Sequence, residues 1–96
     1  MVTVLLHLRA KPGAGDDVER SLVGIVTAAR DYDGCVEIRV VREQEDPDQI
    51  VIIEKWRSRV DFESYVAERD GSSLSADVVK MLEKEPAVRF FNDAEV

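Results

Sequence analysis

Apolar and polar positions follow two different periods along the chain, which predict both strands and helices. Val2–Arg9 is rich in β-branched and large aliphatic residues, and Gln49–Trp56 is a nearly continuous apolar run; both patterns are typical of strands. Residues 36–40 alternate between apolar and polar side chains, and residues 88–91 form a last apolar segment. Between the first two strands, apolar residues recur at the spacing of one helical stripe: Val18, Leu22, Ile25, Val26 and Ala29.

Polar residues between these segments predict where the helices begin. Asp16 is a suitable N-cap, with Glu19 three residues later in the capping-box position. Ser58 and Asp61 repeat this spacing before a second helical region, and Ser75 begins a third. Residues typical of turns separate the elements at 11–15, 33–34, 46–48, 70–73 and 85–86.

The resulting order, β-α-β-β-α-β, predicts a ferredoxin-like α+β fold with an antiparallel four-stranded sheet in a single domain, residues 1–96. The first and third strands are the most apolar, so we expect them in the centre. Leu5 and Leu6 point to opposite faces, as do Ile52 and Ile53, yet the helices cover only one face. The second face therefore predicts a homodimer in which two sheets pack together.

Composition excludes several classes of function. The 96 residues contain 13 Lys and Arg against 20 Asp and Glu, a net charge of −7, which argues against binding nucleic acid or an acidic membrane surface. The longest aliphatic run is four residues, against about 20 for a membrane helix. A single cysteine cannot form an internal disulfide, so we expect a cytoplasmic protein.

The chain contains no strong motif for phosphate binding. Gly13 and Gly15 begin a glycine-rich pattern, but Val18 stands where the third glycine belongs. Asp16 and Asp17 would also repel a phosphate at the start of the helix. A loop before a helix is the favoured interpretation.

Metal sites and a cysteine nucleophile are also disfavoured, and we expect neither a metal nor a cofactor. The acidic turn at 43–48 lacks the spacing and the central glycine of a calcium loop, so a solvated hairpin tip is expected. One His and one Cys cannot complete a zinc site. Cys35 and His7 fall on strands that the third strand separates, so Cys35 is interpreted as a small buried residue entering its strand.

His7 is the candidate catalytic residue, as a proton carrier. It is the only histidine, and imidazole ordinarily gains and loses a proton near neutral pH. It shares a strand face with Thr3, Leu5 and Arg9, a mixed face that suits a pocket or a wet rim. A histidine hydrogen-bonded within the dimer interface is the alternative.

Trp56, Phe62 and Tyr65 are the candidate substrate-binding residues. Aromatic side chains where a strand ends and a helix begins can line a flat slot for an aromatic ligand. A small aromatic core at this corner is the alternative interpretation.

Arg39 is a weaker substrate-binding candidate, for holding a phenolate. In the alternating strand its side chain faces away from Val36, Ile38 and Val40. A guanidinium in solvent is the alternative.

Three segments match a known family in order and spacing: residues 9–13 (Arg-Ala-Lys-Pro-Gly), 33–35 (Asp-Gly-Cys) and 52–58 (Ile-Ile-Glu-Lys-Trp-Arg-Ser). With these segments the chain resembles the antibiotic biosynthesis monooxygenase (ABM) family, including its quinol monooxygenases. The resemblance implies a dimeric α/β barrel. It also implies cofactor-independent oxygenation, by O₂, of phenols, hydroquinones or polyketide-derived aromatics.

The chain departs from the family at several positions. Many quinol-oxidising members carry His where Tyr65 stands and another near Asp70. Polyketide oxygenases use an Asn, a Trp and a Tyr; Trp56 matches the Trp, whereas Ile52 and Phe62 replace the other two.

The sequence thus predicts a cofactor-free monooxygenase that oxidises a hydroquinone, polyphenol or polyketide-type aromatic. Its expected partners are a second copy of the chain, the small aromatic substrate and O₂. Haem degradation is not expected, because that branch needs an Asn where Leu6 stands and a helical His that is absent. Two alternatives remain open: a non-catalytic binding or accessory dimer in a biosynthetic pathway, and a cyclase or isomerase.

Overall fold

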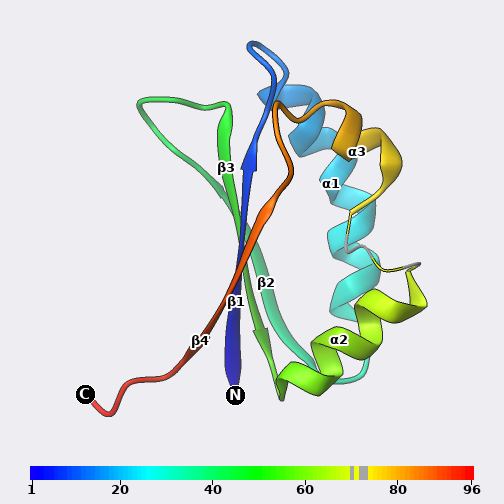
Figure 1. Cartoon of the computed structure of the whole chain (residues 1–96), viewed down its shortest axis with the longest axis vertical. Helices are drawn as coiled ribbons and strands as arrows, with labels where there is room; N and C mark the ends of the chain where they lie inside the picture. The colour runs from blue at the N-terminus through cyan, green and yellow to red at the C-terminus, as the bar shows by residue number, and fades with distance from the viewer. Residues whose placement is uncertain (70, 72–73) are drawn as a thin grey trace.

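The computed structural model describes residues 1–69, 71 and 74–96, and its elements follow the predicted order. Within these residues, four strands form one antiparallel sheet, and three helices lie on one of its faces (Figure 1). The elements are β1 (Val2–Arg9), α1 (Gly15–Arg30), β2 (Cys35–Arg42), β3 (Gln49–Trp56), α2 (Arg59–Glu68), α3 (Ala76–Lys80) and β4 (Ala87–Asn92). The prediction of a ferredoxin-like α+β fold is confirmed.

The central strands β1 and β3 supply most of the core. The strand order is β2-β3-β1-β4, as predicted. Along β1 the side chains alternate: Leu6 and Leu8 are each 1% exposed beneath the helices, whereas Leu5 on the other face is only partly buried. The predicted stripe of α1 packs onto the helix-covered face through Val18, Leu22, Val26 and Ala29.

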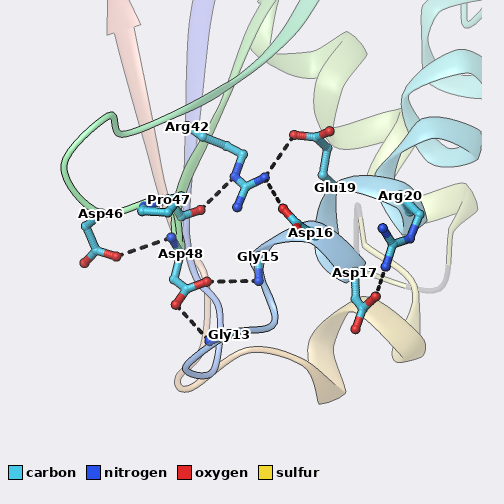
Figure 2. A network of polar contacts seen from close by, with 10 residues as sticks. All are labelled: Gly13, Gly15, Asp16, Asp17, Glu19, Arg20, Arg42, Asp46, Pro47 and Asp48. Carbon is cyan, nitrogen blue, oxygen red and sulfur yellow. Dashed lines mark hydrogen bonds and ion pairs between the residues drawn. The ribbon is translucent and has the colours of Figure 1, made fainter.

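The start of α1 differs from the prediction. The helix begins two residues earlier than an Asp16 cap implies, and its N-cap residue, Ala14, makes no side-chain capping bond. Asp48, in the turn between β2 and β3, instead accepts hydrogen bonds from the backbone N–H groups of Gly13 and Gly15, each at 3.0 Å (Figure 2). The predicted N-cap is therefore wrong, because a carboxylate remote in sequence binds the free N–H groups of this helix end.

Arg42 completes the junction between α1 and the hairpin. Its Nη1 donates to Asp16 at 2.8 Å and to Glu19 at 3.4 Å (Figure 2). A Cβ atom added at Gly15 would lie 2.5 Å from Nη2 of Arg42 and 2.8 Å from Asp48, so this close packing requires glycine. Gly15 therefore serves a tight junction, and the N–H groups of Gly13 and Gly15 that a phosphate would need are already bound by Asp48.

β2 begins with a bulge that breaks the predicted alternation. The register against β3 shifts between Cys35 and Glu37. As a result Val36 is 54% exposed, whereas Ile38 is 3% exposed and Val40 is partly buried beneath the helices. The prediction that these three side chains share one face is wrong for Val36 alone.

The two shorter helices begin at the predicted serines. The Ser58 hydroxyl accepts from the backbone N–H of Asp61 at 3.2 Å, and the Ser75 hydroxyl accepts from that of Val78 at 3.3 Å. Both residues are extended N-caps, as predicted. The predicted break at 70–73 lies mostly outside the described residues.

The sheet face away from the helices is here called the open face. Its side chains follow from the register of the strands: Thr3, Leu5, His7, Arg9, Glu37, Arg39, Val41, Gln49, Val51, Ile53, Lys55, Ala87, Arg89 and Phe91. Leu5, Val51 and Ile53 lie in its centre and are only partly buried. The helices therefore leave apolar surface of both central strands uncovered, as the sequence predicts.

Replacing Asp48 with Asn tests the remote cap. The N–H groups of Gly13 and Gly15 lower the pKa of Asp48, despite the opposing effect of burial. This carboxylate therefore stabilises the fold above about pH 4, and the contribution disappears as the pH falls through the lowered pKa. We expect Asp48→Asn to unfold at lower urea concentration than the wild type at neutral pH, with a difference that shrinks in acid.

Glu43→Gln provides the control, because Glu43 is an exposed carboxylate in the same hairpin. It should unfold like the wild type at both pH values. A loss of stability in Asp48→Asn that is the same in acid as at neutral pH would contradict the capping role.

Candidate functional site

Five aromatic side chains gather where β3 ends and α2 begins, and we call them the aromatic cluster: Tyr32, Trp56, Phe62, Tyr65 and Phe90. The Trp56 ring centre lies 5.7 Å from that of Phe62 and 5.3 Å from that of Tyr65. Phe62 in turn contacts Phe90 of β4 edge-to-face at 5.6 Å. The cluster therefore ties α2 to the central strand β3 and to the edge strand β4.

The three predicted substrate-binding aromatics are brought together, but as packed core. Trp56, Phe62 and Tyr65 are 0%, 5% and 4% exposed, which matches the alternative of an aromatic core at the corner. Phe62 also lines a cavity of about 210 Å³ between α2 and the strands β1 and β4. The other lining residues are Leu6, Val66, Gly71, Leu74, Pro86 and Val88. Since an apolar cavity of about 150 Å³ can hold benzene, this one has room for a small aromatic molecule.

Glu54 is a buried carboxylate at the centre of this region. It lies on β3 between Ile52 and Trp56, on the helix-covered face, and is 4% exposed. Its Oε1 accepts a hydrogen bond of 2.7 Å from the indole Nε1 of Trp56. Burial raises the pKa of Glu54 to about 6, although the Trp56 bond opposes the shift. Glu54 therefore exchanges its proton close to neutral pH.

The titratable neighbours of Glu54 stay neutral in this range. Burial raises the pKa of the Cys35 thiol, with a further contribution from Glu54 and an opposing one from Arg30. Burial also raises the pKa of Tyr65, on α2. Cys35 is thus poorly suited to act as a thiolate nucleophile. It begins β2, as predicted, but it is only partly buried.

The structure does not bring His7 and Arg39 to the aromatic cluster. His7 lies between Leu6 and Leu8 on β1, so its exposed side chain is on the open face, beside a hollow of about 370 Å³. The Arg39 side chain is on the same face and is 61% exposed. The sheet separates both from Trp56, so their predicted roles stay predictions that require a substrate on the open face.

Sequence reasoning misses Glu54, because carboxylates are rarely buried without a cation partner. One signal was present in the sequence. Within an apolar strand, Glu54 shares its face with Ile52 and Trp56, and that face also carries the predicted aromatic site. Only the packing of α2 over this face shows that the carboxylate is buried.

A second hollow, of about 740 Å³, lies between the end of α2 and α3. Arg69 lines it together with Lys80 and Glu68. The Arg69 guanidinium lies 5.6 Å from the centre of the Tyr65 ring, and its Nε is buried with no hydrogen-bond partner among the described residues. Arg69 therefore brings a positive charge to the edge of the aromatic cluster.

In the part of the chain that the structure describes, no three His, Cys, Asp or Glu side chains are grouped to hold a metal ion. No helix among these same residues is long and apolar enough to cross a membrane.

Comparison with known families decides the relationship. Residues 1–70, which include the first three strands, α2 and Glu54, match the model of the antibiotic biosynthesis monooxygenase (ABM) family. The chain belongs to the ABM family. No curated protein sequence matches it.

Solved structures support the ABM fold over the full length. A crystal structure of an antibiotic biosynthesis monooxygenase superposes with a TM-score of 0.86 at 22% identity, covering 98% of this chain and 99% of that one. A conserved protein from Methanosarcina mazei Go1 gives 0.86 at 15% identity, with coverages of 97% and 92%. Rv0793 from Mycobacterium tuberculosis gives 0.84 at 21% identity, with coverages of 99% and 96%. At these identities the likeness shows the fold alone.

Glu54 and Trp56 lie in a segment that matches the ABM family, whereas other residues of this region depart from the family. Tyr65, which stands where many quinol-oxidising members carry His, is packed in the aromatic cluster; Asp70, near the second such position, lies outside the described residues. Phe62, which replaces a Tyr of the polyketide oxygenases, lines the cavity. The buried carboxylate of Glu54 is the titratable group that this chain places beside these aromatics.

Replacing Glu54 with Gln should stabilise the protein at neutral pH. The pKa of Glu54 is raised from 4.5 to about 6 on folding, so its contribution to stability is fully present in acid and is lost as the pH rises to about 6. The charged carboxylate then costs about 2 kcal/mol at neutral pH, which Gln does not incur. Urea unfolding, followed by Trp56 fluorescence, should show the variant gaining stability relative to the wild type between about pH 4.5 and pH 7.

Glu63→Gln is the matched control, because Glu63 lies exposed on α2. Its difference from the wild type should not change over the same pH range. A pH-independent difference in Glu54→Gln would contradict the raised pKa.

Proposed function

We propose that this ABM protein is a cofactor-free monooxygenase that oxidises an electron-rich aromatic, such as a hydroquinone, polyphenol or polyketide-type ring, with O₂. The observation that carries the proposal is the apolar cavity of about 210 Å³ against the aromatic cluster, in a chain of the ABM family. Its walls are mainly aliphatic and aromatic, which suits a flat apolar molecule.

The chemistry suits a site with few titratable groups, because the substrate supplies the electrons. A deprotonated phenol or hydroquinone transfers one electron to O₂, and the resulting radical pair combines to a peroxide. The peroxide then loses water to give a quinone. The protein therefore has to bind the ring, help to remove a proton and shield the anion and radical from water.

A non-catalytic binding or accessory role is the second candidate. It is favoured by Tyr65, which is buried where many quinol-oxidising ABM members carry a histidine, so α2 offers no proton carrier at that position. A binding protein would bind the same ligands in the same cavity but consume no O₂. A cyclase or isomerase would also leave O₂ unchanged while altering its ligand, so the mass of the product separates these two alternatives.

We also propose that the active form is a homodimer joined through the open face. Leu5, Val51 and Ile53 form an apolar centre there that no helix covers. Around this centre lie both signs of charge, including Glu37 and Lys55, which pair with each other within the chain at 4.0 Å. Two copies would remove the uncovered apolar surface from water.

Sedimentation at micromolar concentration should find the mass of two chains. Ile53→Glu, which places a charge in the centre of the open face, should shift the protein to single chains that keep their far-UV circular dichroism. Val23→Glu is the control, since Val23 is 64% exposed on α1. A wild type that sediments as a folded single chain would contradict the dimer.

Oxygen consumption tests the monooxygenase proposal. Purified, metal-stripped protein is mixed with naphthohydroquinones and anthrones in an oxygen electrode. We expect uptake above the uncatalysed rate for at least one compound. Val66→Phe, which fills the cavity, should reduce this uptake by about tenfold or more, since binding in the cavity positions the ring.

Val60→Phe is the matched control, because Val60 lies on the same helix and is 68% exposed. It should consume O₂ like the wild type. Uptake no faster than background for every compound, with the fold intact, would favour the binding protein over the enzyme.

A further inference from the structure

The second hollow, between the end of α2 and α3, has a lining that is partly apolar and partly charged. Its volume of about 740 Å³ falls within the range of sites that hold small molecules. Leu74, Ala76 and Val79 form the apolar part, and Val79 is 43% exposed although its side chain is a branched aliphatic one. A ligand with an apolar body would therefore remove this exposed surface from water.

Arg69 lines the hollow without an anionic partner from the chain. No carboxylate among the described residues forms an ion pair with it. Its Nε is buried with no hydrogen-bond partner, whereas most buried polar atoms of folded proteins have one. The guanidinium stacks instead on Tyr65, 5.6 Å from the ring centre. The fold therefore positions an arginine here and leaves both its charge and a buried N–H group uncompensated.

Lys80 adds a second positive charge to the same hollow. It lies exposed at the end of α3, and within the described parts of the chain it also forms no ion pair. Glu68 is the one carboxylate among the described lining residues. Burial and then a hydrogen bond to Glu68 raise the pKa of Tyr32, so this carboxylate already has a partner. The lining thus carries an excess of positive charge on a chain whose net charge is −7.

A carboxylate attached to an apolar body matches both parts of this lining. The two oxygens of a carboxylate can accept parallel hydrogen bonds from a guanidinium, and an ammonium group such as that of Lys80 adds attraction as a point charge. A small inorganic anion would leave the apolar residues uncovered. An uncharged apolar molecule would leave Arg69 without a counter-charge.

We propose that the second hollow binds an organic carboxylate with an apolar body, such as an aromatic acid. The apolar body covers Leu74, Ala76 and Val79, and the carboxylate pairs with Arg69. This site is separate from the cavity of the proposed function and involves no oxidation. Its occupancy can therefore be tested independently of oxygen uptake.

Binding of 1-naphthoate, compared with its uncharged amide 1-naphthamide, tests the site. Isothermal titration calorimetry of the wild-type protein should show one saturable 1-naphthoate site per chain. 1-Naphthamide should bind at least about tenfold more weakly, because it lacks the charge that pairs with Arg69. Acetate should compete only at much higher concentration, because it covers little apolar surface. Equal affinities for the acid and the amide, or acetate as effective as 1-naphthoate, would overturn the proposal.

Replacing Arg69 separates its charge from its packing. Arg69→Met retains a long apolar side chain and should weaken 1-naphthoate binding by about 10–100-fold, the usual effect of losing a hydrogen bond to a charged group. It should leave the binding of 1-naphthamide unchanged. Arg69→Lys should restore part of the affinity, since an ammonium group cannot offer the two parallel N–H groups of a guanidinium. Arg20→Met, at an exposed arginine of α1, is the matched control and should bind like the wild type.

A second variant keeps the test decisive if Arg69→Met does not fold. Val79→Glu places a further carboxylate in the hollow at an exposed position, so it should fold and lose 1-naphthoate binding. Val60→Glu adds the same charge at an exposed position outside the hollow and should retain binding. Circular dichroism checks that each variant is folded. Unchanged affinity for 1-naphthoate in a folded Arg69→Met or in Val79→Glu would contradict the site.

Val66→Phe distinguishes the second hollow from the cavity, because Val66 lines only the cavity. This variant should bind 1-naphthoate like the wild type. Loss of 1-naphthoate binding in Val66→Phe would place the ligand in the cavity and overturn a separate site. Binding that depends on Arg69 in a protein that consumes no O₂ would support the site and contradict only the monooxygenase.

Discussion

The alternation of side chains along β1 and β3 divides the molecule into two compartments, and only one of them has helices over it. Even-numbered residues of both strands, such as Leu6 and Glu54, lie beneath the helices, and odd-numbered ones, such as Leu5 and His7, lie on the open face. Among the described residues, each candidate site residue belongs to one compartment or the other. The aromatic cluster, the cavity and Glu54 share the covered side, so a sheet of backbone separates them from the single histidine.

Local sequence patterns were sufficient to predict the central strands. The apolar runs of β1 and β3 determine both their bounds and their place in the centre of the sheet. Local patterns failed where a partner remote in sequence decides the outcome. Asp16 has the composition of an N-cap, yet Asp48 occupies the helix end, and no short-range signal reports the closeness of the hairpin. Similarly, the bulge at the start of β2 turns the side chain of Val36 toward solvent.

The candidate site was predictable in part for the same reason. Trp56, Phe62 and Tyr65 are adjacent in sequence to one strand–helix corner, so their meeting follows from local geometry. His7 was favoured for its chemistry, but one step of alternation places it on the wrong side of the sheet for this corner. In the sequence, nothing distinguishes Glu54 from an exposed glutamate. Its pKa is raised only because the folded chain removes the carboxylate from water.

Glu54 is held on β3 more firmly than a side chain on a helix would be. β3 is hydrogen-bonded on both sides, to β1 and β2, so Glu54 stands on one of the most constrained backbones of the fold. The Trp56 indole further limits the orientation of its carboxylate. The sheet thus holds the buried carboxylate in one orientation, and Glu54 lies in the segment 52–58 by which the chain resembles the ABM family.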